Sequence, residues 1–233
     1  MLLEATRITK RFGHRMILSG VELKVQLGEV VSIFGANGAG KTTLIKILAT
    51  LIKPTSGHLQ IGGTDALADP FSVRPSLGLV VHEPLAYLDL SPYENLKFFG
   101  RLYGIDALEE RIKDLLADVG LTPFAHEPIK IFSRGMTQRF MIAKALIHDP
   151  QLLLFDEPFS GLDVTAKQFM LKLIDQERRR GKGILVTTHD TELGYLVGSR
   201  YLFLLNGKIE AVANKNEIGL EELSRRYESQ LKK

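Results

Sequence analysis

The sequence predicts an α/β fold with a mostly parallel sheet, antiparallel strands near the N-terminus and an inserted helical block. Three short apolar runs, "EVVSIF" from Glu29, "QLLLF" from Gln151 and "GILVTT" from Gly183, are separated by helical patterns. Strands that are buried on both faces and have helices between them form parallel sheets. The chain has 233 residues, which suits one large domain over residues 1–233.

The strands nearest the ends of the chain have a different pattern. Partial alternation of apolar and polar residues predicts strands over 2–9 and 15–26, and a further strand and turn over 58–63. Residues 201–213 predict a hairpin, because Asn206-Gly207 favours a tight turn between its two apolar halves. Residues 220–231 have the pattern of an amphipathic helix.

The chain changes character over residues 84–149, which we predict to be a helical subdomain. Apolar residues occur at helical spacing in 91–104 and 108–120, and 133–149 predicts a third helix. A short apolar strand over 77–81 precedes this block. A mostly helical segment therefore interrupts an α/β chain.

Composition excludes several classes of protein. The formal net charge is +3, and no basic stripe with interleaved aromatic residues is present, so we expect no nucleic-acid partner. The chain has no cysteine, which excludes a disulfide framework. The first residues, "MLLEATRITKRF", lack the pattern of a signal peptide. No apolar run approaches the ~18 residues that cross a bilayer, so a transport pathway would have to lie in another chain.

The segment "GANGAGKTT", which begins at Gly35, matches the phosphate-loop pattern between a predicted strand and a predicted helix. Glycines let successive backbone N–H groups point at phosphate oxygens, next to a helix N-terminus that favours negative charge. We expect Lys41 to reach the β- and γ-phosphates and the Thr42 hydroxyl to bind Mg²⁺. The motif predicts a P-loop NTPase core. The residues expected to contact ATP are Gly35, Ala36, Asn37, Gly38, Ala39, Gly40, Lys41, Thr42 and Thr43.

Two carboxylates follow the apolar strand in "LLLFDEP", which begins at Leu152. Ligands bind beyond the carboxyl ends of parallel strands. We therefore expect Asp156 to approach Mg²⁺ through water and Glu157 to be the general base that polarises the attacking water. An ordinary turn is the alternative for this segment when it is taken alone.

A further helix start lies in "FSRGMTQR", where Ser133 is suited to cap the helix and Gly135 permits close approach. Taken alone, this spacing favours ordinary helix capping. The order of the motifs, however, resembles that of the nucleotide-binding subunit of an ATP-binding-cassette (ABC) transporter over essentially the whole chain. That order is the phosphate loop, the Ser-x-Gly helix start, "LLLFDEP", "SGLD" and "TTHD".

The resemblance implies that the segment from Phe132 to Met136 is the signature sequence, which contacts the γ-phosphate of ATP held by a second protomer. Ser133 and Gly135 match the family's Leu-Ser-Gly-Gly-Gln, whereas the other three residues differ. Two chains would enclose two ATP molecules, so each site would be completed in trans. Arg134 either adds positive charge there or faces water. Met136 in place of glutamine weakens the expected ribose contact.

The resemblance assigns three further roles. Asp163 in "SGLD" matches the loop that crosses the dimer seam, and His189 in "TTHD" matches the switch histidine at the γ-phosphate. Phe12 stands where the family has an aromatic residue that stacks on adenine. A core aromatic is the alternative for Phe12.

His82 occupies the place of the family's glutamine that senses Mg²⁺ and the attacking water. Three interpretations are open. Histidine substitutes functionally for glutamine as a catalytic and metal-contacting residue, or it merely tolerates the position, or the alignment slips by one or two residues. Its protonation is sensitive to pH near ~6.5.

The resemblance implies an ATPase that acts with ATP and Mg²⁺, pairs with a second copy or a paralogous cassette, and lies on the cytoplasmic face of the membrane. Its partner would be an integral membrane subunit, most simply an exporter. The segment "VVHEP" is similar to haem exporter cassettes of cytochrome c biogenesis, and "SRGMTQR" is similar to drug and polysaccharide exporter cassettes. A non-transport cassette that acts on ribosomes or DNA is the alternative, which the single cassette without a heptad insertion disfavours.

Overall fold

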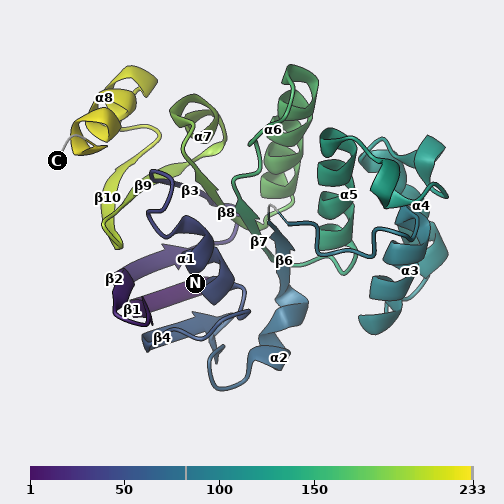
Figure 1. The fold of residues 1–233 in the computed structure, drawn as a ribbon, viewed down its shortest axis with the longest axis horizontal. Coiled ribbons are helices and arrows are strands. Elements are labelled where there is room, and N and C mark those ends of the chain that lie inside the picture. The colour runs from purple at the N-terminus through teal and green to yellow at the C-terminus, as the bar shows by residue number, and fades with distance from the viewer. Residues whose placement is uncertain (82, 232–233) are drawn as a thin grey trace.

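The computed structural model describes residues 1–81 and 83–231, with the backbone alone at residues 211 and 212. Its centre is a six-stranded sheet in the order β10-β9-β3-β8-β7-β6, in which only the β9–β10 pair is antiparallel (Figure 1). The strands are β3 (Val30–Phe34), β6 (Leu77–Val80), β7 (Leu152–Asp156), β8 (Gly183–Thr188), β9 (Arg200–Leu205) and β10 (Lys208–Asn214). Strands β3, β7 and β8 are buried at every residue, as expected for central parallel strands covered on both faces.

A second, smaller sheet is formed by the N-terminal part of the chain. Its order is β2-β1-β4-β5 and every pair is antiparallel. The strands are β1 (Leu3–Phe12), β2 (Arg15–Val25), β4 (Ser56–Ile61) and β5 (Thr64–Asp65). The predicted α/β fold with a mostly parallel sheet and an antiparallel N-terminal part is therefore confirmed.

Helix α1 (Lys41–Leu48) is the next element after β3 and lies between the two sheets (Figure 1). Its residues Leu44, Ile45, Ile47 and Leu48 are fully buried in one core with side chains from both sheets. The helix ends at Leu48, shortly before Thr50, which takes a left-handed conformation with φ of 58°.

The other face of the large sheet is covered by helices from the second half of the chain (Figure 1). They are α5 (Arg134–Leu146), α6 (Val164–Arg179), α7 (Thr191–Val197) and α8 (Leu220–Leu231). A second core joins α5 and α6 to this face, and a cluster of aromatic side chains joins α8 to β3 and β9. These contacts hold the carboxyl ends of β3, β7 and β8 in fixed positions.

Residues 84–149 hold helices α3 (Pro92–Leu102), α4 (Leu108–Asp118) and α5, with short 3₁₀ turns at 122–124 and 129–131. Helix α3 begins with a capping box, in which Ser91 and Glu94 each bind the other's backbone N–H, and with Pro92 at its first position. A short helix, α2 (Pro70–Val73), precedes β6. Across 1–81 and 83–231, no helix is both long enough and apolar enough to cross a membrane.

Candidate nucleotide-binding site

The phosphate loop connects β3 to α1 without a side-chain cap. Gly38 and Gly40 have φ of 83° and 104°, which other residues rarely adopt. Gly40 occupies the N-cap position of α1 and has no side chain to bond the first N–H groups of the helix. A Cβ at Gly40 would also lie 3.0 Å from Leu18 Cδ2. The sequence therefore leaves the helix N-terminus open to an anion.

Lys41 is almost fully buried at the base of this loop, with 6% of its surface exposed. Its ammonium donates to the backbone oxygens of Gly35, at 2.6 Å, and Ala36, at 3.1 Å. It also lies 3.0 Å from Glu157 Oε1. A buried ammonium held by such contacts is a fixed positive charge beneath the loop.

Thr42 and Asp156 come together from α1 and β7. The Thr42 hydroxyl donates to Asp156 Oδ2 at 2.6 Å, and Thr187 of β8 donates to Asp156 Oδ1 at 2.7 Å. Sequence reasoning missed Thr187, although it is the first threonine of the "TTHD" motif. A hydroxyl beside a buried carboxylate fits Mg²⁺, because nucleotide sites bind this ion through one or two protein oxygens, substrate phosphates and water.

Glu157 follows Asp156 in a left-handed conformation with φ of 51°, which is uncommon for a residue with a side chain. Its backbone N–H donates to the Thr187 carbonyl at 3.1 Å, which holds this conformation. Its second carboxylate oxygen lies 2.9 Å from His189 Nδ1. The structure thus brings together Lys41, Glu157 and His189, which are far apart in the sequence.

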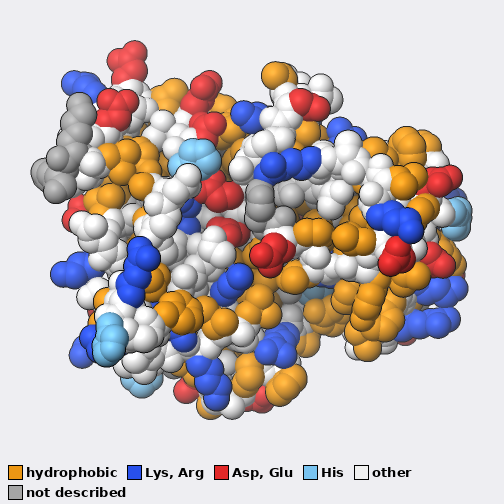
Figure 2. Space-filling view, viewed as in Figure 1, with side chains coloured by type: hydrophobic (Ala, Val, Ile, Leu, Met, Phe, Trp, Pro, Cys, Tyr) orange, Lys and Arg blue, Asp and Glu red, His pale blue; other side chains and the backbone are white. Residues whose placement is uncertain are grey.

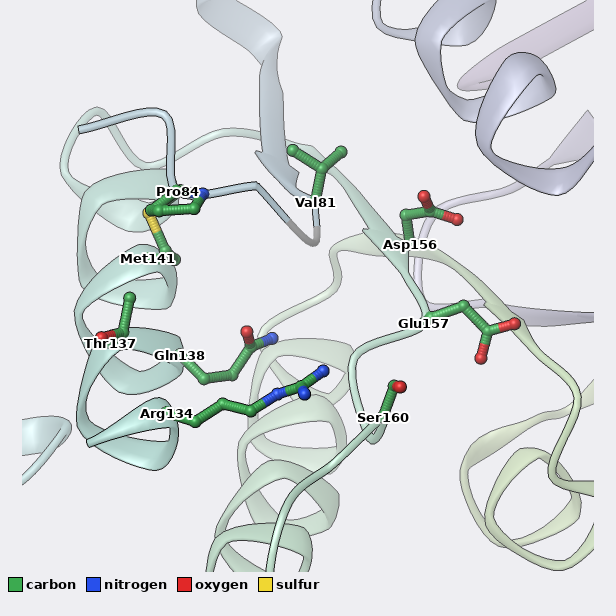
Figure 3. Close-up of a pocket in the computed structure, with 9 residues that line it drawn as sticks. All are labelled: Val81, Pro84, Arg134, Thr137, Gln138, Met141, Asp156, Glu157 and Ser160. Atoms are coloured by element: carbon green, nitrogen blue, oxygen red, sulfur yellow. The ribbon is translucent and has the colours of Figure 1, made fainter.

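A pocket of about 200 Å³ lies beside Glu157, between the end of β7 and the start of α5 (Figure 3). Its lining residues are Val81, Pro84, Arg134, Thr137, Gln138, Met141, Asp156, Glu157 and Ser160. The carboxylates of Asp156 and Glu157 point away from α5. The predictions made for His82 fall outside the described residues.

The predicted signature residues form the first turn of α5. The Ser133 hydroxyl caps the helix by accepting from Met136 N–H at 3.3 Å. A Cβ at Gly135 would lie 3.6 Å from Ala166 Cβ, so α5 starts close to α6. Ordinary capping is therefore present, and it leaves the trans contact with ATP as a prediction.

Arg134 turns back toward its own chain and lies against Gly161. A Cβ at Gly161 would come within 2.4 Å of the Arg134 guanidinium carbon. Figure 3 shows the guanidinium directed toward Ser160 in the pocket. The Arg134 side chain packs on the loop that leads to Asp163 and is also exposed to solvent, so both interpretations of Arg134 stay open.

Asp163 lies at the end of that loop and caps α6. Its carboxylate accepts from Ala166 N–H at 2.8 Å. This contact fixes the start of α6. The role of Asp163 at a dimer seam stays a prediction.

Phe12 lies at the end of β1 with 52% of its surface exposed, and the Lys10 ammonium lies 4.8 Å from its ring centre. The alternative of a core aromatic is therefore wrong. A separate hollow of about 310 Å³ runs over the phosphate loop and includes Arg15 and Ile17 of β2 as well as Thr43. Sequence reasoning missed Arg15, because nothing in its local pattern places β2 beside the loop.

Comparisons with known proteins show the family to which the chain is related. The family model described as ABC transporter matches residues 18–160. The linearmycin resistance ATP-binding protein LnrL of Bacillus subtilis (strain 168) is 32% identical over 93% of this chain and 70% of its own length. The lantibiotic transport ATP-binding protein SrtF of Streptococcus pyogenes is 34% identical over 99% of this chain and 97% of its own length.

A solved structure extends the likeness to a nucleotide-bound assembly. It is the dimeric post-hydrolysis state of an ATP-binding cassette bound to ADP and Pi. Its TM-score to this chain is 0.83 and its sequence is 26% identical, over 92% of this chain and 99% of the solved chain. The fold and the site define a P-loop ATPase. The chain belongs to the ABC transporter family. It is the ATP-binding, ATP-hydrolysing subunit of such a transporter.

Proposed function

We propose that two such cassettes, identical or paralogous, enclose two ATP molecules and power a separate membrane subunit that exports its cargo. The proposal of ATP hydrolysis rests mainly on the position of the Glu157 carboxylate. Its oxygens lie 3.0 Å from Lys41 Nζ and 2.9 Å from His189 Nδ1. A carboxylate held between two nitrogen groups at the carboxyl end of β7 is well placed for a general base.

The phosphate loop and Lys41 bind the phosphates in this proposal. The γ-phosphate competes with Glu157 for the Lys41 ammonium, so ATP binding frees Glu157 to polarise a water molecule. His189 then turns from Glu157 to the γ-phosphate. Thr42 and Asp156 would hold Mg²⁺, and the ion would supply positive charge to neutralise the phosphates.

The trans contact is proposed for the first turn of α5. Its N-terminus carries Ser133, Arg134, Gly135 and Met136, and a helix N-terminus attracts anions. Because Arg134 lies on Gly161, the signature turn and the loop before Asp163 would move together when a second protomer binds. The dimeric solved relative supports this arrangement.

Residues 84–149 are proposed as the subdomain that meets the membrane subunit at the cytoplasmic face of the membrane. Several large apolar side chains there are exposed, including Leu85, Tyr87, Phe98 and Leu102. Exposed apolar surface of this kind marks interaction sites.

The cargo we favour is a drug or peptide antibiotic, because the relatives above are a resistance protein and a lantibiotic transport protein. Haem is the other candidate, and it depends on His82 and the surrounding "VVHEP". Nothing in the described residues adds to that candidate.

Co-purification tests the proposal. The tagged chain is expressed in its native host, membranes are solubilised in mild detergent with ATP and Mg²⁺, and the proteins that accompany the chain are identified. We expect a multi-span membrane protein, and its relatives will narrow the cargo. Recovery with ribosomes or DNA and without a membrane protein would contradict the transport proposal.

A further inference from the structure

The two threonines at the end of β8 project to opposite faces of the large sheet, because side chains alternate along a strand. Thr187 is the direct neighbour of Asp156 in the parallel register of β7 and β8. Thr188 faces α7, where a Cβ at Gly194 would lie 2.8 Å from its methyl carbon and its hydroxyl accepts from the Asp190 N–H at 3.0 Å. Only Thr187 therefore shares a face with the Asp156 carboxylate.

The Thr187 hydroxyl contacts both carboxylate residues at the end of β7. It donates to Asp156 Oδ1 at 2.7 Å. Its other acceptor, the Phe155 carbonyl, is more distant at 3.5 Å, so the proton goes to Asp156. The same hydroxyl oxygen accepts from the Glu157 N–H at 3.3 Å. One hydroxyl thus connects the side chain of Asp156 with the backbone of Glu157.

The Asp156 carboxylate is held at both of its oxygens. Oδ1 accepts from Thr187 of β8, and Oδ2 accepts from Thr42 of α1 at 2.6 Å. The last torsion of an aspartate side chain has broad preferences, so a carboxylate held by one oxygen alone can turn. The bond from Thr187 therefore keeps Oδ2 directed at Thr42, where Mg²⁺ is proposed to bind.

Thr187 itself does not reach the nucleotide site. Its side chain is fully buried, and among the described residues it lines neither the pocket beside Glu157 nor the hollow over the phosphate loop. In the view of Figure 2, acidic side chains reach the surface in the middle of the molecule, in the region where Figure 1 places β7 and β8. Any effect of Thr187 on a ligand must therefore pass through Asp156 and Glu157.

We propose that Thr187 is a positioning residue for Mg²⁺ in the ATP site. Its hydroxyl sets the orientation of the Asp156 carboxylate and holds the backbone of Glu157. The inference rests on the proposed Mg²⁺ site at Thr42 and Asp156. Valine would fill the same space in β8, but it would leave a buried oxygen of Asp156 without its donor.

Equilibrium titration tests the inference without turnover. The probe is a fluorescent ATP analogue with a non-hydrolysable imido bridge between the β- and γ-phosphates. Its affinity is measured with Mg²⁺ and with EDTA, and the ratio of the two affinities is the gain from the ion. Thr187→Val should reduce this gain about 10-fold, the size expected for one charge-assisted hydrogen bond, and leave the affinity in EDTA unchanged.

Three further variants separate the hydroxyl from packing. Thr187→Ser keeps the hydroxyl and should retain the gain of the parent. Thr188→Val removes a hydroxyl that is equally buried, with 1% of the residue exposed, from the opposite face of the same strand, and it should retain the gain as well. Thr187→Cys carries a weak donor and should lose part of the gain, and it replaces Thr187→Val if that variant does not fold.

Two results would overturn the inference and leave the Mg²⁺ site standing. One is a Thr187→Val chain, or a Thr187→Cys chain in its place, that gains as much affinity from Mg²⁺ as the parent. The other is an equal loss of the gain in Thr187→Ser or Thr188→Val, because packing of the strand would then be the cause. A parent chain whose affinity does not depend on Mg²⁺ would instead overturn the proposed metal site and the inference together.

Discussion

At the scale of single residues, the account depends on Lys41 as a fixed charge beneath the phosphate loop. Lys41→Ala should weaken ATP binding about 100-fold or more, since charge-assisted hydrogen bonds to phosphate contribute ~1.5–3 kcal/mol each. Lys46→Ala, on the same helix but away from the loop, is the control and should bind ATP like the parent. Equilibrium titration with a fluorescent ATP analogue measures both. If Lys41→Ala binds the ATP analogue as tightly as the parent, residues 35–43 are not the phosphate-binding loop.

Glu157 is the second residue on which the chemistry depends. Glu157→Gln keeps the shape of the side chain and removes its basicity, so ATP should still bind while turnover falls about 10²–10⁴-fold. Phosphate release assays with Mg²⁺ measure turnover, and Glu192→Gln on the exposed face of α7 is the control. If Glu157→Gln hydrolyses ATP at the parent rate, Glu157 is not the base.

At the scale of elements, the contact between His148, which lies just after α5, and the Leu77 carbonyl of β6, 2.9 Å from its Nε2, should make stability depend on pH. Burial lowers the pKa of His148 below its ordinary value of 6.5, so the folded protein disfavours the imidazolium. Below that value the unfolded chain binds the proton more readily, and stability is lost as the pH falls. The free energy of unfolding should therefore decrease between pH 7.5 and 5.5.

His148→Gln tests this origin, because glutamine can still donate to the Leu77 carbonyl but does not titrate. Urea unfolding at the two pH values should show a smaller loss of stability in the variant than in the parent. An equal loss in both proteins would show that His148 is not the titrating group.

The elements also show how far sequence reasoning extends. Strand β8 and helix α8 have the predicted bounds, because a mostly apolar, β-branched run and a clear amphipathic pattern define them. No bounds were predicted for helix α6, although its buried residues Ala166, Met170, Leu173 and Ile174 follow helical spacing. Helix α7 carries little signal, since it has seven residues and buries only Gly194.

The site was predictable where a short sequence motif determines both the backbone conformation and the position of the side chains, as in the phosphate loop and "LLLFDEP". The pairing of Glu157 with Lys41 and His189 was not, because it depends on the register of β3, β7 and β8. The packing of Arg134 on Gly161 and the place of Arg15 beside the loop also come from contacts between distant elements.

At the scale of the whole molecule, the central claim is that two chains complete each ATP site. The most direct measurement is sedimentation of Glu157→Gln with ATP and Mg²⁺, because slow hydrolysis should trap the closed form. The account predicts a monomer of 26.0 kDa without nucleotide and a species of twice that mass with ATP. It also predicts that adding Lys41→Ala to the variant abolishes the larger species. A Glu157→Gln chain that binds ATP and stays at 26.0 kDa would contradict the account.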